Sequence, residues 1–148
     1  MDQRSNWPLR QQVLYVEDNP VNVMLMRAVF EMRSGLSLSV ATCGAEALEL
    51  GAGLQPSLLL LDIRLPDLPG TDLLPLLRQR LGWVHVPAVA VTAEPASDLE
   101  GKGFIEVWRK PLSVPAMLDR LDSWLSPRTG YLRFGTPPLP CRQSLRAA

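Results

Sequence analysis

Residues 57–70 read SLLLLDIRLPDLPG, in which four leucines are followed by an aspartate and a proline-rich loop. Four consecutive apolar residues are typical of a parallel β-strand that helices cover on both faces. Asp62 stands where this strand should end, and Pro66 and Gly70 favour an irregular loop after it. The stretch therefore predicts a buried parallel strand with a carboxylate at its carboxyl end.

Four more short apolar runs surround this strand in the sequence, at residues 13–16, 36–40, 88–91 and 105–108. The runs at 36–40 and 105–108 alternate apolar and polar residues, which suits strands near the edges of a sheet. Segments of helical periodicity separate the runs. This alternation predicts an α/β fold, with helices on both faces of one parallel sheet. Because crossovers between parallel strands are right-handed, the flavodoxin-like strand order 2-1-3-4-5 is favoured.

A long helix is predicted directly after Asp18. Asn19 can cap it, and Pro20 fits its first turn because a missing N–H costs nothing there. Apolar residues then recur at helical spacing. They predict a buried face that consists of Val21, Met24, Leu25, Ala28, Val29 and Met32.

The second helix is predicted at residues 45–50. The third should begin at Thr71 or Asp72 as N-cap and run through Arg80, with Pro75 in its first turn.

Only residues 96–100 remain for a fourth helix, between Pro95 and Gly101. So few residues do not form a stable α-helix on their own, and a short or irregular element is expected. The last helix should be capped by Ser113. Its predicted buried face consists of Met117, Leu118, Leu121, Trp124 and Leu125.

The composition, with 47% apolar and 20% charged residues, is that of an ordinary folded protein. No apolar run approaches the length of a membrane span, and the first ten residues lack the apolar centre of a secretory signal. Cys43 and Cys141 are the only cysteines, so a disulfide framework is excluded. These features predict a cytoplasmic protein without membrane contact.

Charge is distributed unevenly along the chain. Residues 127–148 hold four arginines and no acid, which leaves 11 basic and 15 acidic side chains, a net charge of −4, in residues 1–126. An acidic body argues against nucleic-acid binding. We therefore expect an N-terminal extension at 1–11, one folded domain at 12–126 and an irregular, proline-containing tail at 127–148.

Polar side chains follow four of the predicted strands. They are Glu17 and Asp18 after the first, Asp62 after the third, Thr92 after the fourth and Lys110 after the fifth. Because parallel strands end at the same edge of a sheet, these side chains should converge. Three carboxylates in one small pocket would repel one another, and a hard cation such as Mg²⁺ relieves that repulsion.

Four segments carry a resemblance to a known family. VLYVEDNPVN (13–22), LLLLDIRLPDLPG (58–70), VAVTAE (89–94) and VWRKPL (107–112) resemble, in this order, the receiver domain of response regulators and hybrid histidine kinases. The resemblance covers about residues 12–125. It implies a flavodoxin-like fold with a five-stranded sheet. It also implies that the protein accepts a phosphoryl group in two-component signalling.

By this resemblance, Asp62 is the phosphoacceptor. Glu17 and Asp18 match the acidic pair that binds Mg²⁺ together with it. Arg64 occupies the position whose backbone carbonyl completes the protein ligands of the metal. Pro66 and Gly70 match the loop that follows the phosphoacceptor.

The resemblance also gives roles to residues at the ends of the fourth and fifth strands. Thr92 matches the hydroxyl that turns toward the phosphoryl group, and Lys110 matches the lysine that pairs with it. The bond between Lys110 and Pro111 is expected to be cis. The implied donor is a phosphohistidine on a sensor histidine kinase or a histidine phosphotransfer protein. The resemblance is also compatible with a homodimer.

One position departs from the family pattern and bears on output. Val107 stands where the family usually has a tyrosine or phenylalanine, so a rotating ring cannot report phosphorylation. Together with the short fourth helix, this predicts that phosphorylation reorders the loop from Thr92 to Gly103.

Two alternatives to a phosphorylated receiver remain. A pseudo-receiver would serve as a protein-binding module without phosphorylation. Val107 and the short fourth helix favour it, whereas the intact acidic pair, Asp62, Thr92 and Lys110 argue against it. A metal-dependent phosphatase typically has a second aspartate two residues after its nucleophile, and Arg64 stands there instead.

His85, the only histidine, precedes Val86 and Pro87 and is expected at the surface.

Overall fold

The structure is a computed structural model, and it describes residues 10–125. Five parallel strands form one sheet in the order β2-β1-β3-β4-β5, which confirms the predicted topology. The strands are β1 (Gln11–Val16), β2 (Leu36–Ala41), β3 (Pro56–Asp62), β4 (Ala88–Thr92) and β5 (Glu106–Arg109). The helices are α2 (Pro20–Glu31), α3 (Gly44–Gly51), α4 (Gly70–Leu81) and α5 (Val114–Leu125), with a 3₁₀ turn η1 (Ala96–Leu99).

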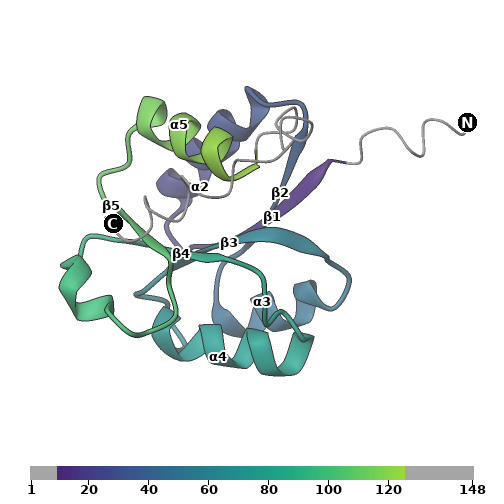
Figure 1. The fold of residues 1–148 in the computed structure, drawn as a ribbon, viewed down its shortest axis with the longest axis vertical. Helices are drawn as coiled ribbons and strands as arrows, with labels where there is room; N and C mark the ends of the chain where they lie inside the picture. Colours follow the sequence, from purple (N-terminus) through teal and green to yellow (C-terminus); the bar gives the residue numbers. More distant parts are fainter. Residues whose placement is uncertain (1–9, 126–148) are drawn as a thin grey trace, which may run out of the picture.

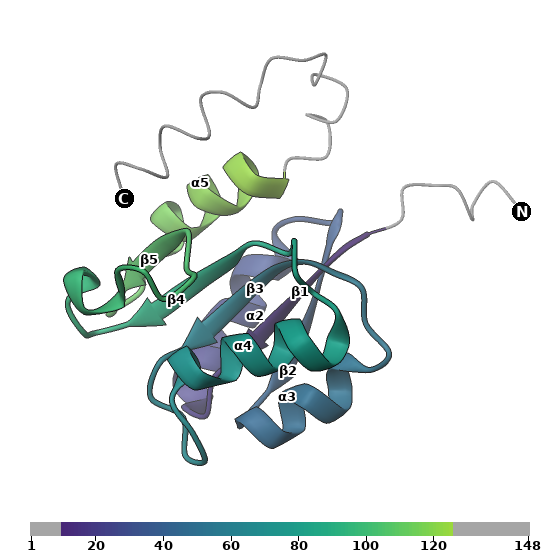
Figure 2. The ribbon, with the colours of Figure 1, turned by 60° about the horizontal axis from the view of Figure 1, so that its bottom comes forward.

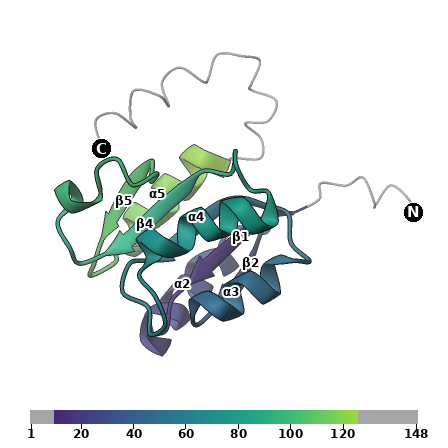
Figure 3. The same cartoon turned by 90° about the horizontal axis from the view of Figure 1, so that it is seen from below.

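Helices lie on both faces of the sheet, α2 and α5 on one and α3 and α4 on the other (Figure 1). Figure 3 shows α3 and α4 side by side over their face. Successive side chains of a strand point to opposite faces, so the leucines of β3 serve both cores. Leu58 and Leu60 pack beneath α2 and α5, and Leu59 and Leu61 pack beneath α3 and α4. This double burial explains why the run has no polar member.

The predicted buried face of α2 was wrong in part: Val29 is buried as predicted and Leu25 is half-buried against the core, but the other members are exposed. The residues that α2 buries are Met26, Val29 and Phe30, whereas Val21 is 68% and Met24 65% exposed. The helix is apolar on nearly its whole circumference, so spacing alone identifies two stripes and does not say which one faces the sheet. The predicted N-cap is confirmed, because Oδ1 of Asn19 accepts hydrogen bonds from the backbone N–H groups of Val21 (2.8 Å) and Asn22 (3.4 Å).

The predicted start of the third helix was also wrong. The helix α4 begins at Gly70 with Pro69 as N-cap, so Thr71 and Asp72 lie inside it and Pro75 falls in its second turn. The earlier start follows from a tight return of the chain, in which the N–H of Gly70 donates to the carbonyl of Ile63 at 2.8 Å.

The remaining elements agree with the sequence. Between β4 and β5 the chain forms only η1 and loops, as the short interval predicted (Figure 2). In α5, Met117, Leu121 and Leu125 are buried, and the others of the predicted face are half-buried. Ser113 lies just before this helix, where its Oγ accepts from the N–H of Ala116 at 3.4 Å. No helix in residues 10–125 has the length and hydropathy that crossing a bilayer would require.

Candidate phosphorylation site

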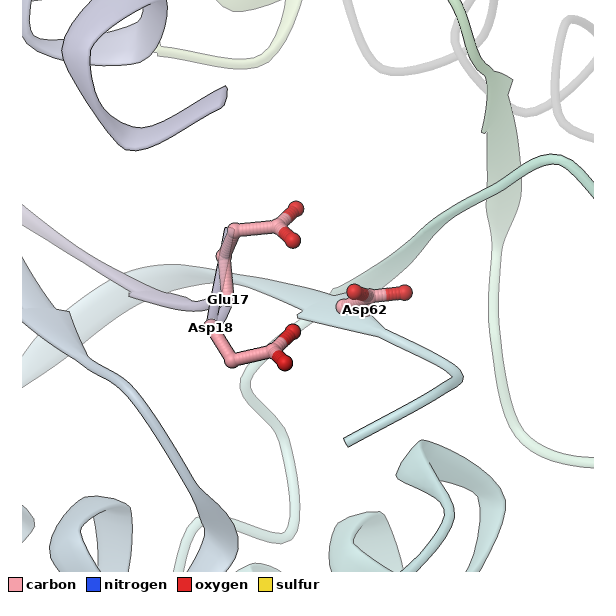
Figure 4. A group of neighbouring side chains, drawn as sticks. All are labelled: Glu17, Asp18 and Asp62. Atoms are coloured by element: carbon pink, nitrogen blue, oxygen red, sulfur yellow. The ribbon is translucent and has the colours of Figure 1, made fainter. Parts of the chain in front are cut away.

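Three carboxylates converge at the carboxyl edge of the sheet. Glu17 and Asp18 follow β1, and Asp62 is the last residue of β3, the strand that pairs with β1. One carboxylate oxygen from each lies within 4.8 Å of the other two (Figure 4). The parallel register places them there, because neighbouring strands that end together bring their end residues side by side.

Lys110 supplies the positive charge in this cluster. Its Nζ lies 3.0 Å from Oε1 of Glu17 and 3.2 Å from Oδ2 of Asp62. The lysine follows β5, and its N–H donates to the carbonyl of Thr92 at 2.9 Å, which fixes where the side chain starts. The peptide bond between Lys110 and Pro111 is cis, as predicted.

Burial acts to raise the pKa of both inner carboxyls, but their hydrogen bonds shift the two pKa values in opposite directions. Asp62 is 4% exposed, and burial together with the neighbouring Glu17 raises the pKa of Asp62 to about 6. Burial also acts to raise the pKa of Glu17, but hydrogen bonds with Asp62, Lys110 and Tyr15 outweigh it and lower that pKa. Burial disfavours the charged form of Lys110, yet both carboxylates hold its pKa above the usual value. The cluster thus keeps Glu17 charged and makes Asp62 the group that takes up a proton.

Tyr15 belongs to the site and was missed by the sequence analysis. Its hydroxyl donates to Oε1 of Glu17 at 2.9 Å, and burial followed by the charge of Glu17 raises the pKa of the phenol. The signal was available, because residues two apart in a strand share a face. The N–H of Asn19 also donates to Oε2 of Glu17 at 3.2 Å, so this carboxylate is held at both oxygens.

Thr92 lies at the end of β4, next to the strand of Asp62, and is buried. Its Oγ1 accepts a hydrogen bond from the N–H of Glu94 at 3.0 Å. Glu94 in turn binds the guanidinium of Arg64 at 2.8 Å, while the N–H of Arg64 donates to Oδ1 of Asp62 at 3.1 Å. This ion pair ties the loop after β3 to the loop after β4. Local sequence patterns do not predict this ion pair, because its partners are 30 residues apart.

The loop after Asp62 is held by a second acid. Both carboxylate oxygens of Asp67 accept backbone N–H groups at the start of α3, from Gly44 and Ala45 at 2.8 Å each. These hydrogen bonds lower the pKa of Asp67, and they supply the cap that Cys43 does not provide by its side chain. The loop therefore docks on a helix instead of standing free.

Gly70 sets the distance between α4 and the end of β3. A Cβ at this position would overlap the carbonyl oxygen of Asp62 and lie 3.1 Å from Cα of Ile63. Both neighbours are backbone atoms at the end of β3, where Asp62 stands, so they cannot move without moving this carboxylate.

We expect Gly70→Ala to lower the free energy of unfolding by about 1–3 kcal/mol, because overpacking displaces the backbone. Gly53→Ala is the matched control, since nothing lies within 4 Å of its Cβ position. It should be neutral or stabilise by about 0.4–1 kcal/mol through the unfolded chain. Urea unfolding of both variants measures the difference, and equal stabilities would show that α4 does not set the position of Asp62.

Known proteins share this arrangement. The family model of the response regulator receiver domain matches residues 13–122. The polar-differentiation response regulator DivK of Brucella ovis is 34% identical over 121 residues, which cover 79% of this chain and 98% of DivK.

Solved structures agree with the sequence comparison. The receiver domain of sensor histidine kinase PA1611 from Pseudomonas aeruginosa PAO1, described with a magnesium ion coordinated in its active site cleft, is 27% identical. It has a TM-score of 0.67 and matches 79% of this chain and 98% of its own. The chemotaxis response regulator CheY4 of Vibrio cholerae has a TM-score of 0.71 over 78% of this chain and 99% of its own; at 19% identity, this likeness concerns the fold. On the family match, the DivK relative and the fold, the chain belongs to the response regulator receiver domains of two-component signalling.

Proposed function

We propose that Asp62 accepts a phosphoryl group from a phosphohistidine of a sensor histidine kinase or a histidine phosphotransfer protein. The observation that carries the proposal is the cluster itself. A buried aspartate lies within hydrogen-bond distance of Lys110 and within 4.8 Å of two further carboxylates, Glu17 and Asp18. A cytoplasmic location is part of the proposal, because such donors act there.

The donor set fits Mg²⁺. Three carboxylates with one nearby lysine leave an excess of negative charge, and oxygen ligands are those that Mg²⁺ prefers. Glu17, Asp18 and Asp62 would hold the ion, together with the backbone carbonyl of Arg64. When bound, Mg²⁺ supplies charge that neutralises the phosphoryl oxygens.

The residues of this chain supply the rest of the reaction. One carboxylate oxygen of Asp62 attacks the phosphorus, an acyl phosphate bond forms, and the bond from phosphorus to the histidine nitrogen breaks. The ammonium of Lys110 shifts from the carboxylate to a phosphoryl oxygen. The hydroxyl of Thr92 gives up the hydrogen bond that its oxygen accepts from the N–H of Glu94 and donates to another phosphoryl oxygen, which would alter the loop after β4.

This exchange at Thr92 is the proposed route of the signal. Val107 is half-buried and packs against Ile63, Ala90 and Leu99 in a small cluster of its own. Since no ring stands at this position, we propose that the loop from Thr92 to Gly103 changes its order when Asp62 is phosphorylated.

The proposal is tested by incubating the protein with acetyl phosphate and Mg²⁺ and measuring intact mass. One phosphoryl adduct that requires Mg²⁺ supports it. Absence of an adduct, with beryllofluoride binding also absent, would favour a pseudo-receiver that binds partners without phosphorylation. Catalytic turnover of a phosphate ester would point to a phosphatase instead.

We expect the affinity for Mg²⁺ to depend on pH. In the metal-free protein the pKa of Asp62 is about 6, so below this pH a bound proton must be displaced before the carboxylate can bind the ion. The dissociation constant should rise about tenfold for each pH unit below about 6 and level off above it. Calorimetry on both sides of this pH measures it, with Asp98→Asn on η1 as a control that keeps the profile. A flat profile would remove Asp62 from the ligands.

A further inference from the structure

One side of α2 is apolar and exposed. Its residues, called here the outer stripe, are Val21, Met24, Ala28 and Met32. Val21, Met24 and Met32 are 68%, 65% and 53% exposed, and they make up three of the five large hydrophobic side chains that residues 10–125 expose. A helix that is apolar on both its inner and outer sides is expected to be covered on both.

The described part of the chain ends near one end of this stripe. The helices α2 and α5 pack side by side on one face of the sheet (Figure 1). Their C-terminal ends are joined, because the guanidinium of Arg33 binds both carboxylate oxygens of Asp122 at 2.7 and 2.8 Å. The chain therefore leaves α5 at Leu125 close to the end of α2 that carries Met32.

The chain that follows Leu125 is long enough to reach the whole stripe. The helix α2 has 12 residues, which is about 18 Å. The sequence contains 23 residues after Leu125, and an extended chain spans about 3.3 Å per residue.

The chemistry of this segment complements the stripe. It carries Tyr131, Leu132 and Phe134 close together, and its four arginines are accompanied by no acid, against a net charge of −4 in residues 1–126. Glu31 is exposed and lies one turn from Ala28 on the same helix. Arg27 lies on the β2 side of the helix, where it lines a pocket with Phe30 and Leu38, so it does not oppose a basic segment on the stripe.

We propose that the outer stripe of α2 is the docking surface for residues 131–134 of this chain, with Tyr131, Leu132 and Phe134 in contact with Met24, Ala28 and Met32. Covalent attachment favours this occupant over a separate partner, because it provides an effective concentration in the millimolar range. The proposal does not depend on phosphorylation of Asp62, and each can fail without the other.

Methyl NMR of the full chain tests the docking, with methionine methyl groups as reporters and a soluble paramagnetic agent. Buried Met26 and Met117 are internal references. In the wild type, Met24 and Met32 should be relaxed nearly as little as these references. In the triple variant Tyr131→Ser, Leu132→Ser, Phe134→Ser, their relaxation should increase several-fold. Gln143→Ser is the matched control in the same segment and should behave as the wild type.

Three results would overturn the proposal. Strong relaxation of Met24 and Met32 in the wild type would mean that the stripe is open. Protection in the wild type and the triple variant that is lost on dilution would assign the stripe to a second copy of the chain. Protection in both that is independent of concentration would assign it to a different segment.

Discussion

Replacing Asp62 by asparagine should abolish phosphoryl incorporation from acetyl phosphate. The amide has nearly the shape of the carboxylate but lacks the oxygen nucleophile, so no acyl phosphate can form. The fold should persist, because the asparagine is neutral and Asp62 already sits where burial penalises its charge. Intact mass shows the loss, and far-ultraviolet circular dichroism shows that the variant is folded.

The control for this experiment is Asp72→Asn. Asp72 is an exposed acid in the first turn of α4, and it is not expected to be phosphorylated. Replacing it should therefore leave the phosphoryl adduct on Asp62 unchanged. An adduct that survives Asp62→Asn would move the phosphoacceptor elsewhere. Asp18 would be the first candidate, because it is exposed and has an oxygen within 4.8 Å of Asp62. Reduction of the acyl phosphate with borohydride followed by peptide mass spectrometry would identify the residue.

The sequence predicted the strand order and the residues of the site for the same reason. Both depend on strands that are buried on two faces, and such strands leave a strong apolar signal, as in residues 58–61 of β3. Once the sheet is parallel, its end residues must meet, so Glu17, Asp62 and Lys110 could be placed together from local patterns alone.

Two kinds of feature could not be predicted. One is the side of a helix that faces the sheet, and the other is a contact between residues that are far apart in the sequence. The periodicity of α2 predicted the helix and the burial of Val29 but placed Met24 inside in place of Met26, because the two are equally apolar and only the packed sheet distinguishes them. The start of α4 depends on a hydrogen bond from Gly70 to Ile63 across a loop. The Arg64–Glu94 ion pair likewise requires that two loops already lie in place.

Removing Lys110 should destabilise the metal-free protein strongly. Its ammonium is the one cation within 4 Å of Glu17 and Asp62 in the described part of the chain, and their side chains are 0% and 6% exposed. Deleting one partner of a buried ion pair costs about 3–5 kcal/mol, because the other charge stays buried without compensation. We expect a loss of this size for Lys110→Ala in urea unfolding near neutral pH without Mg²⁺. Lys102→Ala is the matched control, since the only other lysine is exposed on the surface and should change stability by less than about 0.5 kcal/mol.

The dependence of this loss on pH and on metal separates an electrostatic role of Lys110 from simple packing. Without the lysine, the pKa of Asp62 rises further above its value in the unfolded chain, so the variant loses stability as pH rises through that range. The deficit relative to the wild type should therefore be smallest in acid, where both carboxyls are protonated, and largest at neutral pH. Mg²⁺ should restore much of it, because the ion provides the missing positive charge between the same oxygens. A deficit that is constant with pH and unaffected by Mg²⁺ would mean that Lys110 acts through its aliphatic chain and that the three carboxylates do not form a metal site.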